Sequence, residues 1–79
     1  MTYYLYILRS LKDTNLYVGH TQDLKSRIKT HNQGKVRSTK NRRPFKLVHF
    51  EEYNTQDEAI KRERFLKSLK GAEFKKRFR

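Results

Sequence analysis

The sequence predicts a small α/β domain of the α+β kind, in which a three-stranded antiparallel sheet is flanked by helices in the order β-β-α-β-α-α. Segments rich in aromatic and aliphatic residues alternate with turn-forming residues, as is typical of strands. Capping residues precede two segments whose apolar residues recur with the period of an α-helix. A chain of 79 residues has room for one hydrophobic core, so we expect a single domain over residues 1–79.

Three strands are expected. Tyr3–Leu8 and Leu16–His20 have strand character, and the turn-forming segment Leu11–Asn15 lies between them. These two strands should therefore pair as an antiparallel hairpin. Aliphatic and aromatic residues recur again in Phe45–Tyr53, which predicts the third strand.

The first helix is expected to follow Thr21 or Asp23, either of which can cap it, and to run to about Asn32. Gly34 stands where a left-handed C-terminal cap belongs. The segment Lys35–Pro44 has no apolar periodicity, which predicts a basic loop.

The second helix should begin at the capping box Thr55–Glu58 and run to about Lys70. We expect Gly71 to stop it. A short last helix over Ala72–Phe78 would then place two phenylalanines on one face.

Charge is both strong and unevenly distributed. The net charge is +12 on a 9.7 kDa chain. From Leu24 to Phe50 there are nine Lys or Arg residues and no carboxylate. This favours a polyanionic partner, because Lys and Arg contacts to phosphates release condensed counterions. A solvated basic face is the plain alternative, and no helix combines a basic face with a purely apolar one as membrane surfaces require.

The composition also limits the chemistry and the cellular location. The sequence has no cysteine, which excludes disulfides, thiolate catalysis and cysteine-based zinc sites. The apolar run Tyr3–Leu8 ends at Arg9 and lacks a basic start, so it is neither a signal peptide nor a membrane span. We expect a cytoplasmic protein.

Both helices carry charged or polar residues on their inward sides. In the first helix, Arg27 and His31 share the core stripe. A buried arginine is costly unless an anion pairs with it, although Arg27 at the edge of the stripe and His31 as a satisfied core residue remain alternatives. In the second helix, Glu63 falls within the apolar arc. That arc consists of Ala59, Ile60, Leu66 and Leu69.

Glu63 has two explanations. It could pair with a neighbouring cation, Lys61, Arg62 or Arg64. It could also bind a divalent cation, since magnesium accepts one protein carboxylate and keeps several waters, which leaves room for a substrate phosphate.

Two short motifs lie across the expected hairpin, Tyr4-Leu5-Tyr6 and Tyr17-Val18-Gly19, and Arg27, His31 and Glu63 follow in that order. This arrangement resembles the GIY-YIG nuclease family, in particular its compact stand-alone bacterial members, which are related to the N-terminal domain of the excinuclease C subunit. The resemblance extends from about residue 2 to residue 70. It implies a central three-stranded antiparallel sheet and hydrolysis of DNA phosphodiester bonds with Mg²⁺ or Mn²⁺.

The resemblance also implies roles for particular residues. Glu63 would hold the metal and Arg27 would bind the scissile phosphate. A phenol, Tyr6 or Tyr17, would take a proton from the attacking water, and His31 would orient a group or relay the proton. Cations of the basic loop would bind neighbouring phosphates with little sequence specificity. They are Lys35, Arg37, Lys40, Arg42 and Arg43.

The implied function is that of an endonuclease, structure-selective and linked to DNA repair or recombination. Two positions depart from the family pattern: Tyr4 replaces the leading glycine, and no asparagine follows Glu63, where many active members carry one. The second departure favours the alternative of a nucleic-acid-binding module without catalysis. A small RNA-binding protein whose exposed tyrosines stack on unpaired bases is a third possibility.

Overall fold

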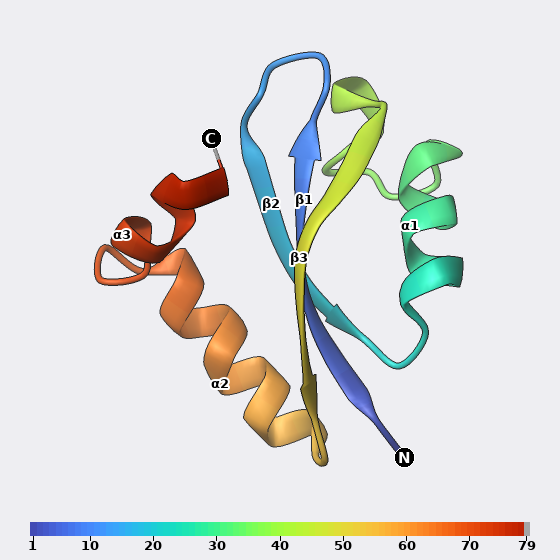
Figure 1. The fold of residues 1–79 in the computed structure, drawn as a ribbon. Helices are drawn as coiled ribbons and strands as arrows, with labels where there is room; N and C mark the ends of the chain where they lie inside the picture. The colour runs from blue at the N-terminus through green and yellow to red at the C-terminus, as the bar shows by residue number, and fades with distance from the viewer. Residues whose placement is uncertain (79) are drawn as a thin grey trace.

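The computed structural model describes residues 1–78 and confirms the α+β class (Figure 1). In chain order the elements are β1 (Tyr3–Ser10), β2 (Leu16–Thr21), α1 (Leu24–Asn32), β3 (Phe45–Tyr53), α2 (Gln56–Lys67) and α3 (Ala72–Lys75), with 3-10 helices at Lys40–Arg42 and Lys76–Phe78. Among the described residues, no helix is long and apolar enough to cross a membrane.

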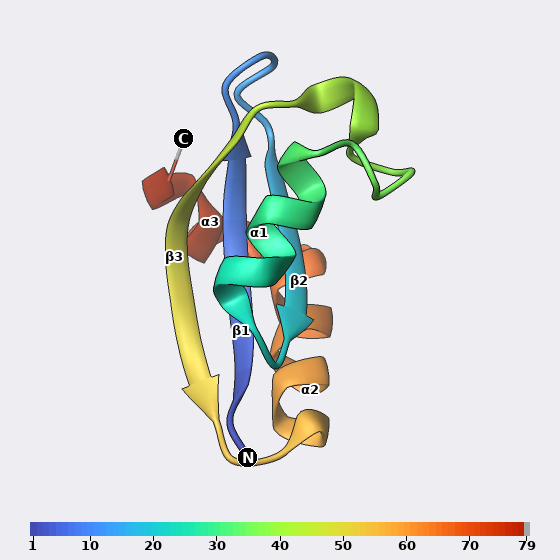
Figure 2. The same ribbon diagram turned by 90° about the vertical axis from the view of Figure 1, so that its right-hand side faces the viewer.

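The three strands form one antiparallel sheet in the order β2-β1-β3, with β1 in the centre. Helix α1 covers one face, whereas α2 and α3 cover the other (Figures 1 and 2). Because side chains alternate along a strand, successive residues of β1 face different helices. Leu5 and Ile7 pack on the α2 side, and Tyr6 and Leu8 on the α1 side.

Each face therefore has its own small core. On the α2 side the buried residues are Leu5, Ile7, Val18 and Leu66. On the α1 side they are Tyr6, Leu8 and Phe45. The second core is built largely from aromatic rings, and one of them carries a polar atom that must find a partner in the interior.

Local signals set both ends of α1 as the sequence predicts. Asp23 caps the helix, because its Oδ1 accepts the Ser26 N–H at 3.0 Å. At the other end Gly34 has φ +78°. The Gly34 N–H donates to the His31 carbonyl at 3.1 Å and the Lys35 N–H to the Thr30 carbonyl at 3.2 Å, which completes a Schellman cap.

Helix α2 begins as predicted but ends earlier. Thr55 Oγ1 accepts the Glu58 N–H at 3.2 Å. The predicted end at Lys70 is wrong: the helix stops at Lys67, where Ser68 adopts an extended backbone. Leu69 is consequently 94% exposed and does not belong to the apolar arc.

Gly71 does not stop the helix but lies close against it. A Cβ at this position would lie 2.3 Å from the Phe65 carbonyl oxygen, so the chain can turn back over α2 only with glycine here. The return brings Phe74 and Phe78 together on one face, with ring centroids 5.5 Å apart, as the sequence predicts.

Candidate active site

Three buried side chains are joined by hydrogen bonds: Tyr6 of the central strand, His31 of α1 and Thr39 of the basic loop. The Tyr6 hydroxyl lies 2.9 Å from His31 Nε2. His31 Nδ1 lies 2.8 Å from the hydroxyl oxygen of Thr39. Tyr6 is 1% exposed, and His31 and Thr39 are fully buried. The inward histidine is thus hydrogen-bonded at both ring nitrogens.

Arg27 approaches the same phenol from the partly exposed side of α1. Its Nε donates to the Tyr6 hydroxyl oxygen at 3.4 Å, and this hydrogen bond raises the pKa of Arg27. Within residues 1–78 the guanidinium has no carboxylate within ion-pair distance. The site therefore offers a fixed positive charge to an external anion.

Tyr17 and Gly19 on β2 complete this group. The Tyr17 ring packs against the His31 ring, with centroids 4.9 Å apart. A Cβ on Gly19 would lie 2.6 Å from the Tyr6 hydroxyl and 3.2 Å from Tyr17 Cε2. The glycine of the second motif is therefore required for the close approach of Tyr6 to β2.

The environment shifts the titration of both buried groups. Burial raises the pKa of Tyr6, an effect that the Arg27 hydrogen bond partly opposes. Burial, together with the positive charge of Arg27, lowers the pKa of His31 to about 4. At neutral pH the phenol and the imidazole are consequently both uncharged.

Glu63 has two partners that the sequence analysis did not anticipate. Its Oε1 accepts from His20 Nδ1 at 2.6 Å, and its Oε2 accepts from Lys67 Nζ at 2.7 Å. Burial favours a higher pKa for Glu63, but the His20 and Lys67 hydrogen bonds outweigh it and hold the pKa below its usual value. The predicted neighbours at positions 61, 62 and 64 do not pair with it.

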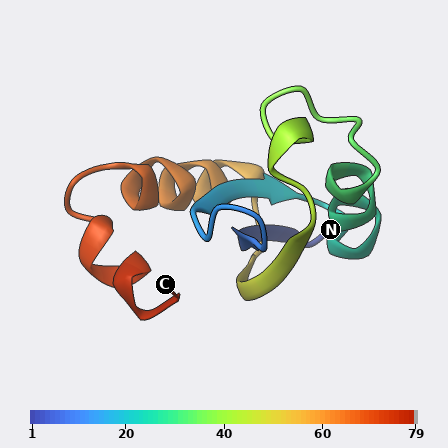
Figure 3. The ribbon, with the colours of Figure 1, turned by 90° about the horizontal axis from the view of Figure 1, so that it is seen from above.

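Glu63 belongs to α2, on the other side of the sheet from α1, with β2 running between them (Figure 3). Lys67 extends from the carboxylate to the Tyr17 ring, where its Nζ lies 5.8 Å from the centroid. The negative charge of Glu63 also contributes to the raised pKa of Tyr6. Four of the predicted residues thus form one contact group: Tyr6, Tyr17, Arg27 and His31. Glu63 lies at the edge of this group, without a direct hydrogen bond to its members in the described chain.

The donor set at Glu63 fits a metal ion held by one carboxylate. The described residues contain no group of three or more His, Cys, Asp or Glu side chains that could hold a metal. Mg²⁺ does not need one, since a single carboxylate oxygen with waters and substrate phosphate is sufficient. His20 fixes Oε1, whereas Lys67 on Oε2 is half exposed and can leave.

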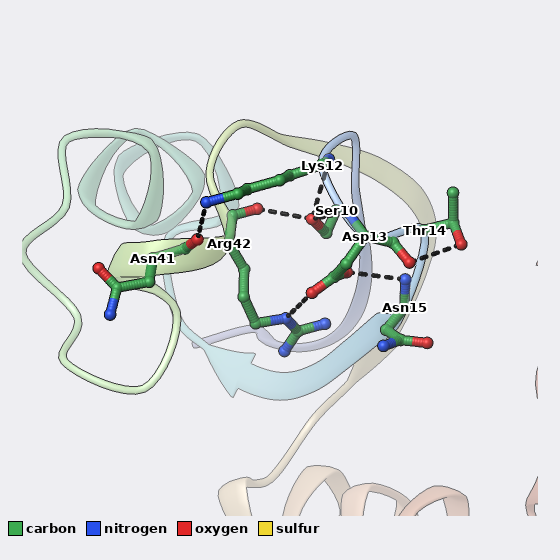
Figure 4. A network of polar contacts seen from close by, with 7 residues as sticks. All are labelled: Ser10, Lys12, Asp13, Thr14, Asn15, Asn41 and Arg42. Atoms are coloured by element: carbon green, nitrogen blue, oxygen red, sulfur yellow. Dashed lines mark hydrogen bonds and ion pairs between the residues drawn. The ribbon is translucent and has the colours of Figure 1, made fainter.

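The basic loop is fastened to the β1–β2 turn through several hydrogen bonds (Figure 4). Ser10 Oγ donates to the Arg42 carbonyl at 2.6 Å, and Lys12 Nζ donates to the Asn41 carbonyl at 3.1 Å. Arg42 Nε pairs with Asp13 at 2.9 Å. Arg42 is therefore already engaged within the protein, whereas the other predicted loop cations are exposed. These are Lys35, Arg37, Lys40 and Arg43.

An open hollow of about 380 Å³ lies between this turn and the loop. Its lining residues are Lys12, Asn32, Lys40, Asn41, Arg43 and Pro44. Three of them are cationic and none is acidic, so the hollow suits a phosphate group. Sequence reasoning missed Lys12, because it lies on the hairpin turn and reaches the loop only in the folded chain.

The fold and the arrangement of these residues are those expected of the GIY-YIG family, and comparison with known proteins agrees. The family model described as the GIY-YIG catalytic domain matches residues 2–77. The chain therefore belongs to the GIY-YIG family, as its two motifs indicate.

Particular relatives carry the name UPF0213. The UPF0213 protein YazA of Bacillus subtilis is 41% identical over 68 residues, which are 85% of this chain and 68% of that protein. The UPF0213 protein CPE1444 of Clostridium perfringens is 46% identical over 67 residues, 84% of this chain and 71% of that protein. The solution NMR structure of the UPF0213 protein BH0048 from Bacillus halodurans is similar with a TM-score of 0.55 and 38% identity, covering 92% of this chain and 80% of that chain.

Proposed function

We propose that the protein is a divalent-metal-dependent endonuclease that hydrolyses DNA phosphodiester bonds. One observation supports this most directly: Arg27, without a carboxylate partner in the described chain, donates to a buried phenol that is itself bonded to a neutral histidine. A phosphate at Arg27 would lie beside a group able to move a proton. Membership of the GIY-YIG family also supports nuclease activity, in general terms.

Arg27 binds the scissile phosphate and the additional negative charge that develops on it in the transition state. A planar guanidinium suits this role because it presents parallel donors to two phosphate oxygens. Binding of the anion also neutralises the charge that helps to lower the pKa of His31. His31 thereby becomes a better proton acceptor when substrate is present.

Tyr6, and not Tyr17, is the phenol that transfers the proton. The attacking water gives a proton to the Tyr6 oxygen while Tyr6 gives its own proton to His31 Nε2, 2.9 Å away. The raised pKa of Tyr6 leaves almost no free phenolate at neutral pH, so a concerted transfer is required. The water oxygen bonds to phosphorus, and the 3′-oxygen leaves with the electron pair of the broken bond.

Glu63, whose carboxylate is kept in place by His20, would hold Mg²⁺ or Mn²⁺ in competition with Lys67. Such an ion would supply positive charge that stabilises the developing negative charge of the phosphate and its leaving group. The exposed loop cations and Lys12 bind flanking phosphates, which gives affinity without sequence information. A role in DNA repair or recombination stays a prediction from the resemblance, and a cytoplasmic location stays a prediction from the composition.

The test is DNA cleavage by the purified protein. Supercoiled plasmid and short flapped or branched duplexes are incubated with wild type and Glu63→Gln, in Mg²⁺, Mn²⁺ or EDTA. We expect cleavage by wild type with either metal and none with EDTA or with Glu63→Gln. Full metal-dependent activity in Glu63→Gln would show that the metal assignment is wrong.

The alternative function is a binding module that has the fold without the chemistry. The missing asparagine after Glu63 favours it, and the net charge of +12 supports it as well as it supports the nuclease. DNA that is retarded in a gel but stays intact under every metal condition would support this alternative. A matched RNA that competes better than DNA would instead indicate an RNA-binding protein.

A further inference from the structure

The hydrogen bonds around His31 form a chain with a direction. Arg27 can only donate, so the Tyr6 oxygen accepts from it. The Tyr6 proton then needs an acceptor, and within the described chain its hydroxyl lies within hydrogen-bond distance of one, His31 Nε2 at 2.9 Å. At the other end Thr39 Oγ1 can donate to the Val36 carbonyl at 3.4 Å.

This direction selects one form of the neutral imidazole. With the proton on Nδ1, His31 donates to Thr39 at 2.8 Å and Nε2 accepts the Tyr6 proton, so every donor is used. With the proton on Nε2, both His31 and Arg27 would donate to the Tyr6 oxygen, and the Tyr6 proton would have no acceptor. An unsatisfied buried donor is costly, which favours the first form.

Backbone hydrogen bonds hold Thr39 in position beside His31. Its N–H donates to the Val36 carbonyl at 3.1 Å, and its own carbonyl accepts the Arg42 N–H at 2.9 Å. It is fully buried and is followed directly by the 3-10 helix that begins at Lys40. The hydroxyl is thus held at His31 Nδ1 by the backbone of the basic loop.

We infer that Thr39 is a positioning residue that keeps His31 in the Nδ1–H form, so that Nε2 is free to accept the proton of Tyr6. The role in catalysis rests on the proposed nuclease function, whereas the assignment of the tautomer does not. Groups that orient a functional histidine through its second nitrogen typically change activity by roughly 10- to 100-fold when removed, as metal-ligating histidines show.

Two variants distinguish the effect of the Thr39 hydroxyl from the effect of its side-chain volume. Thr39→Val keeps the shape but removes the acceptor of the Nδ1 proton, whereas Thr39→Ser keeps the hydroxyl. The readout is side-chain ¹⁵N NMR of the three histidines, whose ring nitrogens report directly where the proton lies. His49, whose Nε2 is bonded to Glu51, serves as the internal control, because neither variant touches it.

In wild type and Thr39→Ser we expect His31 with protonated Nδ1 and bare Nε2. In Thr39→Val either form leaves one buried donor unpaired, the Nδ1–H or the Tyr6 hydroxyl, so the Nε2–H form should appear beside the Nδ1–H form, with the His49 signals unchanged. A wild-type His31 that carries its proton on Nε2 would overturn the inference, as would a Thr39→Val variant in which no Nε2–H form appears. If Thr39→Val fails to fold, the wild-type and Thr39→Ser spectra still decide the tautomer.

Cleavage kinetics test the catalytic part separately. Thr39→Val should lower kcat roughly 10- to 100-fold with unchanged affinity for DNA, and Thr39→Ser should restore kcat. Equal loss of kcat in both variants would contradict a role of the hydroxyl. If wild type holds the expected tautomer but cleaves no DNA, the proposed function fails while the assignment of Thr39 stands.

Discussion

Two clusters on opposite faces of the sheet use the same residue types and differ in how completely they are paired. Each contains a tyrosine, a histidine, an arginine and a glutamate. On the α1 side these are Tyr6, His31 and Arg27, together with Glu63 of α2, which lies at the edge of that group. On the α2 and α3 side they are Tyr53, His49, Arg62 and Glu51.

In the second cluster the carboxylate joins all the other members. Glu51 accepts from Arg62 at 2.9 and 3.2 Å, from Tyr53 at 2.6 Å and is bonded to His49 at 2.9 Å. Burial favours a higher pKa for Glu51, but these donors outweigh it and lower the pKa to about 2. Such a saturated network stabilises the fold and leaves no group free to bind a ligand.

In the first cluster the glutamate stands apart, held by His20 and Lys67. Arg27 is partly buried beside the phenols of Tyr6 and Tyr17 and has no carboxylate within ion-pair distance, so its charge is not neutralised within the described residues. Identical residue types therefore acquire different roles from their connectivity. The absence of a described carboxylate partner for Arg27, and not the presence of titratable groups, is what supports the proposal that an anion binds there.

The largest contrast should come from the two arginines. Arg27→Ala should lower kcat/KM by roughly 10² to 10³, because it removes a donor to the developing phosphate charge. Thermal stability should change little, since Arg27 has no ion pair in the described chain. Arg62→Ala is the matched control and should destabilise the fold by about 3 kcal/mol by leaving Glu51 without its cation. Loss of specific activity in the folded Arg62→Ala protein would contradict the division of roles.

The two clusters should also affect the free energy of unfolding in different ranges of pH. Folding lowers the pKa of Glu51 from 4.5 to about 2, so its ionised form contributes stability above pH 4.5 that is lost as pH falls to 2. Folding lowers the pKa of His31 from 6.5 to about 4, so the unfolded chain binds an extra proton and stability falls between pH 6.5 and 4. Each of these two pKa shifts corresponds to ~3 kcal/mol in the free energy of unfolding.

Chemical denaturation from pH 7 to pH 2 measures both effects. Glu51→Gln should reduce the pH dependence of the free energy of unfolding between pH 4.5 and 2. His31→Gln should reduce it between pH 6.5 and 4. An unchanged slope between pH 6.5 and 4 in His31→Gln would show that His31 is not buried in its neutral form.

The smallest effect is expected at the hollow beside the basic loop. Lys12→Ala should weaken binding of a short DNA duplex by several-fold and reduce the slope of log K against log salt by about 1. Lys61→Ala removes the same charge from α2, where Lys61 pairs with Asp57. Equal losses in the two variants would mean that only net charge matters.

Local sequence signals account for most of the fold. The strands, the Asp23 cap and the left-handed Gly34 follow from residue types and their neighbours. The end of α2 was missed because positions 67–70 contain no helix breaker, and a tertiary constraint at Gly71 turns the chain instead. Thr39 could not be predicted either, because its partner lies on another element and no periodicity links them.

The candidate site was predictable only as a set of residue types. Arg27 and His31 stand out because they interrupt an apolar stripe, which is a local signal. His20 carries no such signal, since a half-buried histidine on an edge strand is ordinary until α2 places Glu63 beside it. The directed chain through Tyr6 required coordinates, because it depends on which atoms lie within 3 Å.

The most direct test of the account compares the buried phenol of Tyr6 with the partly buried phenol of Tyr53. Tyr6→Phe and Tyr53→Phe each remove one hydroxyl that is bonded to a titratable partner. Single-turnover cleavage of a flapped duplex in Mg²⁺ is measured beside the midpoint of thermal unfolding. The account predicts that Tyr6→Phe loses cleavage by roughly 10² or more while still binding DNA, and that Tyr53→Phe loses stability but keeps its cleavage rate. Full cleavage by Tyr6→Phe would contradict the account.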